Sequence, residues 1–128
     1  MSQNKPKVPR PWDRTPWPER GDDNINDTYA GVGRALSQWE RYEAGLALLF
    51  SAVVAGIKTT AAMRAYSAVR TFEARVEMLR AASAAYFAKS PDEAVQKIFV
   101  EVVRDAACFS PRRNDIAHGV VEIGGAHV

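Results

Sequence analysis

The strongest constraint on the fold of this chain is a seam of apolar residues that recurs every three or four positions through its first half. The seam consists of Ile25, Tyr29, Val32, Leu36, Trp39, Leu46, Phe50, Val53 and Ile57. This spacing predicts one long α-helix with one buried face, interrupted by a single polar residue, Glu43. At 1.5 Å per residue, about thirty residues make a rod of roughly 45 Å, so the domain is expected to be elongated.

Polar and glycine residues predict where this first helix begins and ends. Asn24, Asn26 or Asp27 can cap its first turn, and Gly56 marks its end. A second apolar stripe predicts another helix over residues 61–89. This stripe consists of Ala65, Val69, Phe72, Val76, Leu79, Ser83 and Tyr86.

Two serine-proline pairs divide the remainder of the chain. Ser90, Pro91 and Glu93 supply a cap, a proline at the first helical position and a glutamate three residues after the cap, which predicts a third helix to about residue 108. Ser110 and Pro111 repeat the signature, so the helix is expected to break or kink there and restart as a short helix over residues 112–119. The prediction is an all-α, elongated up-and-down bundle of three long helices plus a short helix.

Residues 1–24 differ in composition from residues 25–128, which are assigned to the bundle. They hold five prolines amid charged residues, a composition that favours extended or disordered backbone. This arm also carries Trp12 and Trp17, and a tryptophan left in solvent loses the large stabilisation that burial of its ring would give. Two interpretations follow: at least one tryptophan docks on the helical body or on a partner subunit, or the arm is a free tail.

Length and composition indicate one soluble domain of 128 residues. The net charge of +2 gives no broad basic face, so any contact with nucleic acid requires a local cluster. Cys108 is the single cysteine and no histidine or carboxylate cluster has ligand spacing, so neither a disulfide nor a metal or other cofactor is expected. No apolar stretch approaches the roughly 18 residues of a membrane span and no signal peptide is evident, which predicts a cytoplasmic protein.

The segment 113–118 is the only place where catalytic chemistry has an obvious position. Of the two histidines, His127 lies beside the terminus next to two glycines, which leaves His118 as the candidate general base. Asn114 and His118 are four residues apart and share a helix face, which Arg113 can reach through its long side chain. Because Pro111 precedes this segment, we expect it in a first helical turn, where free N–H groups favour an anion.

Neighbouring charges bear on whether Arg113 is available. Asp115 can pair with Arg112 at a spacing of three, which would leave Arg113 free. In the apolar seam, Glu43 is costly unless it is paired, and we expect Arg113 or His118 as its partner, with Glu43 and Arg113 in direct salt-bridge reach. In the alternative, the helix twists enough for Glu43 to reach solvent. From spacing alone, His118 can equally be a residue that caps or packs a helix end.

The run from Arg113 to His118 resembles the hallmark of the HEPN superfamily, which is Arg-x4-6-His with a polar residue directly after the arginine. Arg113, Asn114 and His118 fill those three places. The run Trp39-Glu40-Arg41-Tyr42-Glu43, followed by Leu46 and Leu49-Phe50, is similar to an aromatic-acid-leucine pattern of many bacterial members. The likeness spans roughly residues 25–120.

This resemblance implies a helical bundle that dimerises so that two motifs face one groove, and a metal-independent endoribonuclease. It implies that His118 takes the ribose 2'-hydroxyl proton or serves in the acid step, that Arg113 holds the crowded phosphorane and that Asn114 orients the phosphate or the imidazole. The implied partners are a second copy of the chain, RNA and a cognate antitoxin in a toxin–antitoxin or defence system. Two alternatives stay open: a non-catalytic helical interaction module in which Arg113 and His118 are structural, and a nucleotide-binding protein.

Overall fold

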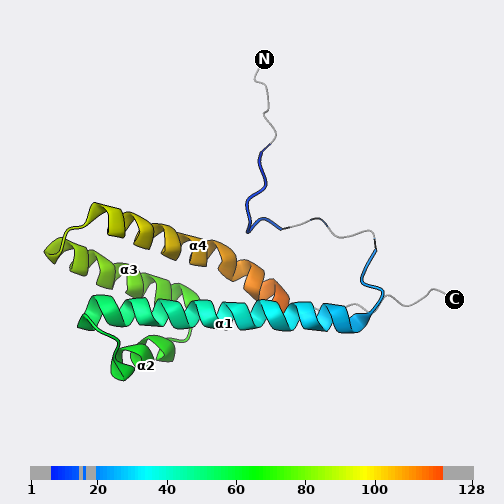
Figure 1. Ribbon diagram of the computed structural model, residues 1–128, viewed down its shortest axis with the longest axis horizontal. Coiled ribbons are helices and arrows are strands. Elements are labelled where there is room, and N and C mark those ends of the chain that lie inside the picture. The colour runs from blue at the N-terminus through cyan, green and yellow to red at the C-terminus, as the bar shows by residue number, and fades with distance from the viewer. Residues whose placement is uncertain (1–6, 15, 17–19, 120–128) are drawn as a thin grey trace, which may run out of the picture.

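A computed structural model describes residues 7–14, 16 and 20–119 of the chain. These residues form four α-helices and no strand, which confirms the predicted all-α class (Figure 1). The helices are α1 (Ile25–Ala55), α2 (Thr60–Ala68), α3 (Phe72–Lys89) and α4 (Glu93–His118). None of the helices in this part of the chain is long and apolar enough to cross a membrane.

The helices run up and down around α1, the longest of them. α1 has 31 residues, a length of about 47 Å, and the short α2 carries the chain back along it so that α3 and α4 can follow as an antiparallel pair. The buried core lies along the C-terminal half of α1. It comprises Leu46, Ala47, Phe50, Tyr66, Val76, Leu79, Phe87, Phe99, Val103 and Ala106.

The predicted ends of α1 are confirmed. Asn24 is its N-cap, and the side-chain oxygen of Asn24 accepts a hydrogen bond from the backbone N–H of Asn26. Gly56 ends the helix with a φ of 73°, the left-handed conformation that favours glycine. Local capping chemistry therefore fixes both ends.

The single helix predicted over residues 61–89 is wrong, because the chain leaves the helix at Val69 and restarts it after Thr71. Thr71 caps α3 by accepting a hydrogen bond from the N–H of Ala74 at 3.2 Å. The Arg75 side chain donates to the backbone oxygens of Val69 at 2.8 Å and Ser67 at 3.0 Å. These carbonyls would be left without helical partners at the end of α2, so the arginine compensates for the break.

The start of α4 also differs in detail from the prediction. Asp92, not Ser90, is the N-cap, and its carboxylate accepts a hydrogen bond from the N–H of Val95 at 3.1 Å. Pro91 therefore precedes the cap instead of following it. Asp and Ser are comparable capping residues, so the signature predicted a helix start but not which of the two would cap it.

The break expected at Pro111 is wrong, since α4 continues through this proline to His118. An interior proline loses one backbone hydrogen bond and costs about 3 kcal/mol. Side-chain contacts flank it on both sides: Phe109 packs against Trp12, and Asp115 binds Arg112 and Arg14. The motif therefore belongs to the last turns of a long helix, and no separate short helix exists.

The arm docks on this end of α4. The ring of Trp12 meets Phe109 edge to face at 5.6 Å, and Arg14 donates to both carboxylate oxygens of Asp115 at 3.1 Å. The expectation that at least one tryptophan packs on the helical body is confirmed by Trp12, and Trp17 lies outside the described residues.

Candidate functional site

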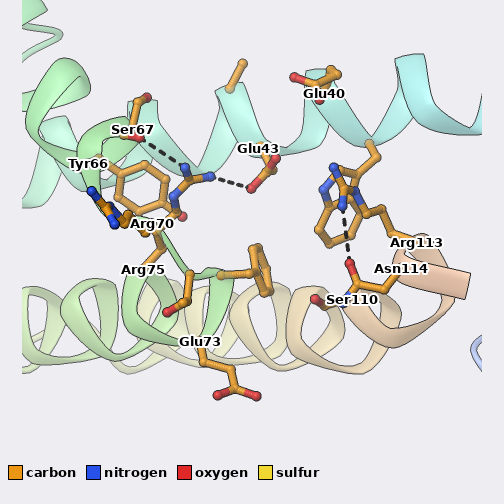
Figure 2. Close-up of a pocket in the computed structure, with 14 residues that line it drawn as sticks. Glu40, Glu43, Tyr66, Ser67, Arg70, Glu73, Arg75, Ser110, Arg113 and Asn114 are labelled. Atoms are coloured by element: carbon orange, nitrogen blue, oxygen red, sulfur yellow. Dashed lines mark hydrogen bonds and ion pairs between the residues drawn. The ribbon is translucent and has the colours of Figure 1, made fainter. Parts of the chain in front are cut away.

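A pocket of about 790 Å³ opens beside the start of α3, and α4 extends past this point. It brings Glu43 of α1 and Arg75 of α3 together with two residues of the predicted motif, Arg113 and Asn114 of α4 (Figure 2). α4 reaches this position because it outruns α3 along the N-terminal half of α1 (Figure 1). The continuous helix through the proline is therefore what carries the motif to the pocket.

Glu43 is paired, but not with the residue predicted from the sequence. Its Oε1 lies 2.8 Å from Nη1 of Arg75, and the two side chains are 18% and 20% exposed. The predicted salt bridge to Arg113 is wrong, and His118 does not fill the role either. Arg75 prevails because its own bonds to the α2 carbonyls fix the guanidinium beside Glu43. The expectation that a carboxylate in the seam needs a partner is confirmed.

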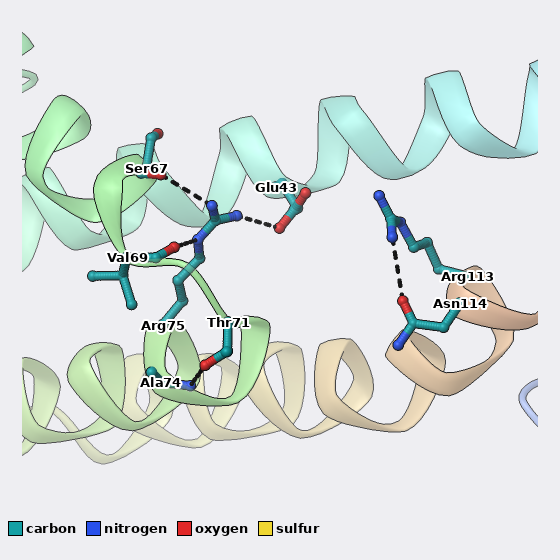
Figure 3. Close-up of polar contacts among 8 residues, drawn as sticks. All are labelled: Glu43, Ser67, Val69, Thr71, Ala74, Arg75, Arg113 and Asn114. Carbon is teal, nitrogen blue, oxygen red and sulfur yellow. Dashed lines mark hydrogen bonds and ion pairs between the residues drawn. The ribbon is translucent and has the colours of Figure 1, made fainter. Parts of the chain in front are cut away.

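Arg113 is left with few partners as a result. Its Nη1 donates to Oδ1 of the adjacent Asn114 at 3.2 Å, and its Nε is buried without an acceptor in the described part of the chain. Among the ion pairs of the described residues, none involves Arg113. Figure 3 shows Glu43 between the two guanidinium groups, bonded to Arg75 alone. An unmet buried donor costs about 1–3 kcal/mol, so the hydrogen bonds of the described chain do not account for the position of this guanidinium.

Arg112 pairs with Asp115, as the sequence predicted. Its Nη1 lies 2.9 Å from Oδ2 of Asp115, a carboxylate that Arg14 also binds. Two cations therefore satisfy Asp115, which keeps this neighbouring carboxylate from engaging Arg113.

His118 lies in the last turn of α4, is exposed and does not line the pocket. The prediction of a first helical turn is wrong, so the backbone presents carbonyl groups here and the anion-binding N–H groups of a helix start are not available. The structure thus brings Arg113 and Asn114 together in the pocket and leaves His118 one turn further along the helix.

Sequence reasoning missed Arg75 and Tyr66. Arg75 lies next to the core residue Val76 and three positions after Phe72, and a cation at the edge of an apolar stripe signals a buried carboxylate partner. Tyr66 is 1% exposed, and its hydroxyl has no hydrogen-bond partner within the described residues. Burial raises the pKa of Tyr66 to about 12, so the hydroxyl stays protonated and can donate.

The described residues contain no group of three or more histidine, cysteine, aspartate or glutamate side chains placed to hold a metal ion. Comparisons with protein-family models, with curated proteins and with solved structures found no match to this chain. The resemblance to the HEPN superfamily therefore stays a prediction carried by the motif residues.

Proposed function

We propose that this chain is an RNA-binding protein of HEPN type that cleaves RNA without a metal ion. The observation that carries the proposal is the state of Arg113: it lines a pocket, lacks a carboxylate partner in the described chain and keeps a buried Nε–H unmet. A planar guanidinium with free donors matches the oxygens of a phosphodiester in geometry and in charge.

Each residue of the motif has a chemical task in this proposal. Metal-free cleavage needs a base for the ribose 2'-hydroxyl proton and a cation for the charge on the phosphorane. The exposed His118 serves as the base, and Arg113 holds the phosphate oxygens. Asn114 accepts a hydrogen bond from Arg113 and so orients the guanidinium. The 2'-oxygen bonds to phosphorus as the bond to the 5'-oxygen breaks, and the departing 5'-oxygen takes a proton from water, which leaves a 2',3'-cyclic phosphate and a 5'-hydroxyl.

The proposed active form is a homodimer in which the motifs of two copies share one groove. Two aromatic residues of α1 that such an interface could use are engaged within their own chain. The ring centres of Trp39 and Phe72 are 5.2 Å apart, and the Tyr42 hydroxyl donates to the Val102 backbone oxygen at 2.9 Å. Ile116, an exposed aliphatic residue of α4 within the motif segment, offers apolar surface there instead. A stable dimer would bury about 1,200 Å² or more, and a monomer in light scattering at tens of micromolar would remove the shared groove.

The test is cleavage of total tRNA in excess EDTA by the wild type and by three variants. His118→Ala should lower the rate by roughly a hundred- to ten-thousand-fold, because general base catalysis is lost. Arg113→Lys keeps the charge but loses the planar fork, so we expect a large loss there too. His127→Ala, which removes the other histidine, is the matched control and should retain the wild-type rate. Undiminished cleavage by His118→Ala would assign the activity to another site or to a contaminant.

Binding without cleavage is the second candidate, because His118 does not line the pocket that holds Arg113 and Asn114. In that case the wild type would bind RNA or a nucleotide through Arg113 and release no cyclic phosphate. A purely structural lock is disfavoured by the exposure of His118 and by the pairing of Glu43 with Arg75. If the chain is a toxin, an antitoxin is the protein partner that would restrain it.

A further inference from the structure

The pocket beside Arg113 has an aromatic wall that the motif does not explain. Trp39 and Phe72 both line it, and their ring centres are 5.2 Å apart. We propose that this pocket binds one unpaired nucleobase of an RNA strand, stacked on Trp39, while Arg113 holds the adjacent phosphate. The inference rests on the proposed RNA-binding function and extends it to the class of substrate, which is single-stranded RNA.

Trp39 is suited to stacking because its ring is held in place before any ligand arrives. Phe72 and Tyr42 pack around it at ring-centre distances of 5.2 and 5.9 Å, while the residue remains partly exposed. A base stacked on an aromatic side chain strengthens binding by roughly five- to 150-fold, whichever base it is. A rigid indole at the pocket wall therefore gives affinity without requiring a particular sequence.

Polar groups of the pocket match the edge of a base. Asn114 lines the pocket and is exposed, and a carbonyl oxygen or ring nitrogen of a base can accept from its side-chain amide. Glu43 uses only Oε1 to bind Arg75, so within the described chain its second oxygen remains an acceptor for a base N–H.

The size of the pocket limits what can enter it. A volume of about 790 Å³ lies in the range of small-molecule sites and accommodates one nucleotide. A base within a duplex is stacked and paired, so it cannot turn its face to Trp39 without leaving the helix. The pocket therefore selects a strand whose bases are free.

The experiment is fluorescence anisotropy in EDTA with a labelled eight-nucleotide RNA, its duplex, and versions that carry one abasic position each. His118→Ala in the protein prevents turnover. We expect the single strand to bind at least tenfold more tightly than the duplex, and one abasic position to weaken binding by roughly five- to 150-fold. In the Trp39→Leu protein the abasic position should weaken binding no further, whereas in Trp39→Phe the abasic position should still weaken binding. Trp12→Leu, at the aromatic contact of the arm, is the matched control.

The outcomes separate this inference from the function on which it rests. If Arg113→Gln weakens binding but no abasic position does, the base pocket is overturned and RNA binding stands. The same holds if an abasic position weakens binding to Trp39→Leu as much as it weakens binding to the protein with Trp39. Equal or tighter binding of the duplex also overturns it. If the wild type binds no RNA in any form, the proposed function fails and the inference with it. Should Trp39→Leu not fold, judged by its melting curve, the abasic series on the wild type and on Trp39→Phe decides.

Discussion

Two arginines line the same pocket on either side of Glu43 and are in opposite states (Figure 3). Arg75 donates from Nε to the Val69 oxygen, from Nη1 to Glu43 and from Nη2 to the Ser67 oxygen, all within 3.0 Å. Arg113 makes one hydrogen bond, to its neighbour, and its buried Nε has no acceptor in the described chain. The fold uses the donors of one guanidinium and leaves those of the other available.

This difference separates a structural cation from a candidate binding cation without reference to any relative. Buried donors in folded proteins are almost always bonded, so each exception calls for a physical reason. Arg75 joins α1, α2 and α3, and removing it would leave one carboxylate and two carbonyls unmet. Arg113 joins nothing in the described chain beyond its own helix, so its side chain is explained by a ligand better than by the fold.

The largest expected effect is on function at Arg113. Arg113→Gln should lower RNA cleavage in EDTA by roughly a hundredfold or more, as removal of a preorganised donor to developing charge does. Its unfolding free energy should change by less than about 1 kcal/mol, because no ion pair is broken. Initial rates and urea titrations measure the two effects. Arg104→Gln, at an exposed arginine of the same helix that does not line this pocket, is the control and should cleave like the wild type. Equal losses in both variants would show that the effect is not specific to Arg113.

The next effect is on stability at Arg75. Arg75→Met strands Glu43 and two backbone carbonyls, so the free energy of unfolding should fall by about 3 kcal/mol, the lower end of the cost of breaking a buried pair. Glu43→Ala should cost a similar amount, and the double variant clearly less than the sum. Urea denaturation of all three proteins gives this coupling. Additive losses would show that the two side chains do not act as a unit.

A smaller effect is expected where the arm docks beside the motif. Trp12→Ala should lower the free energy of unfolding by about 1 kcal/mol, since it removes an aromatic contact. Arg14→Ala should cost less than about 0.5 kcal/mol, because its ion pair with Asp115 is exposed and Asp115 keeps Arg112. Thermal melts in low and high salt compare the two variants. The opposite order would mean that charge, and not packing, holds the arm.

The last effect concerns Tyr66, whose hydroxyl is buried without a partner in the described chain. Tyr66→Phe should stabilise the fold by about 0.5–1 kcal/mol at neutral pH, since an unmet polar group is removed. Burial raises the Tyr66 pKa from 10 to about 12, so the folded protein keeps the phenol proton more strongly than the unfolded chain does. The free energy of unfolding of the wild type should therefore be constant in this respect below pH 10 and fall as the pH rises toward 12. Chemical denaturation at pH 8 to 12 should show this loss in the wild type and a flatter profile in the variant.

Local patterns in the sequence predicted the helical class and the ends of α1. The three- and four-residue spacing of the seam requires a helix, and Asn24 and Gly56 act through bonds to residues close to them in the chain. The Arg112–Asp115 pair was accessible for the same reason, because residues three apart on a helix are neighbours.

Contacts between distant segments decided what the sequence could not predict. The break at 69–71 contains neither glycine nor proline, and it is compensated by the Arg75 side chain, which also displaces Arg113 as the partner of Glu43. Pro111 lies within a continuous helix. On either side of this proline, Phe109 and Asp115 contact the arm. The partner of Glu43 and the arm contacts beside Pro111 come from segments far away in the chain, whereas the bonds of Arg75 at the break span only six and eight residues.

The most direct test of the difference between the two arginines is an NMR spectrum of their Nε–H groups with and without single-stranded RNA, in the uncleaving His118→Ala protein. Arg75→Lys and Arg113→Lys assign the two signals. We expect the Arg75 signal to be protected from exchange in the free protein and unchanged by RNA, because its proton is bonded to the Val69 oxygen. The Arg113 signal should shift on addition of RNA as its donors find phosphate oxygens. A spectrum in which RNA moves the Arg75 signal and leaves Arg113 unchanged would contradict the account.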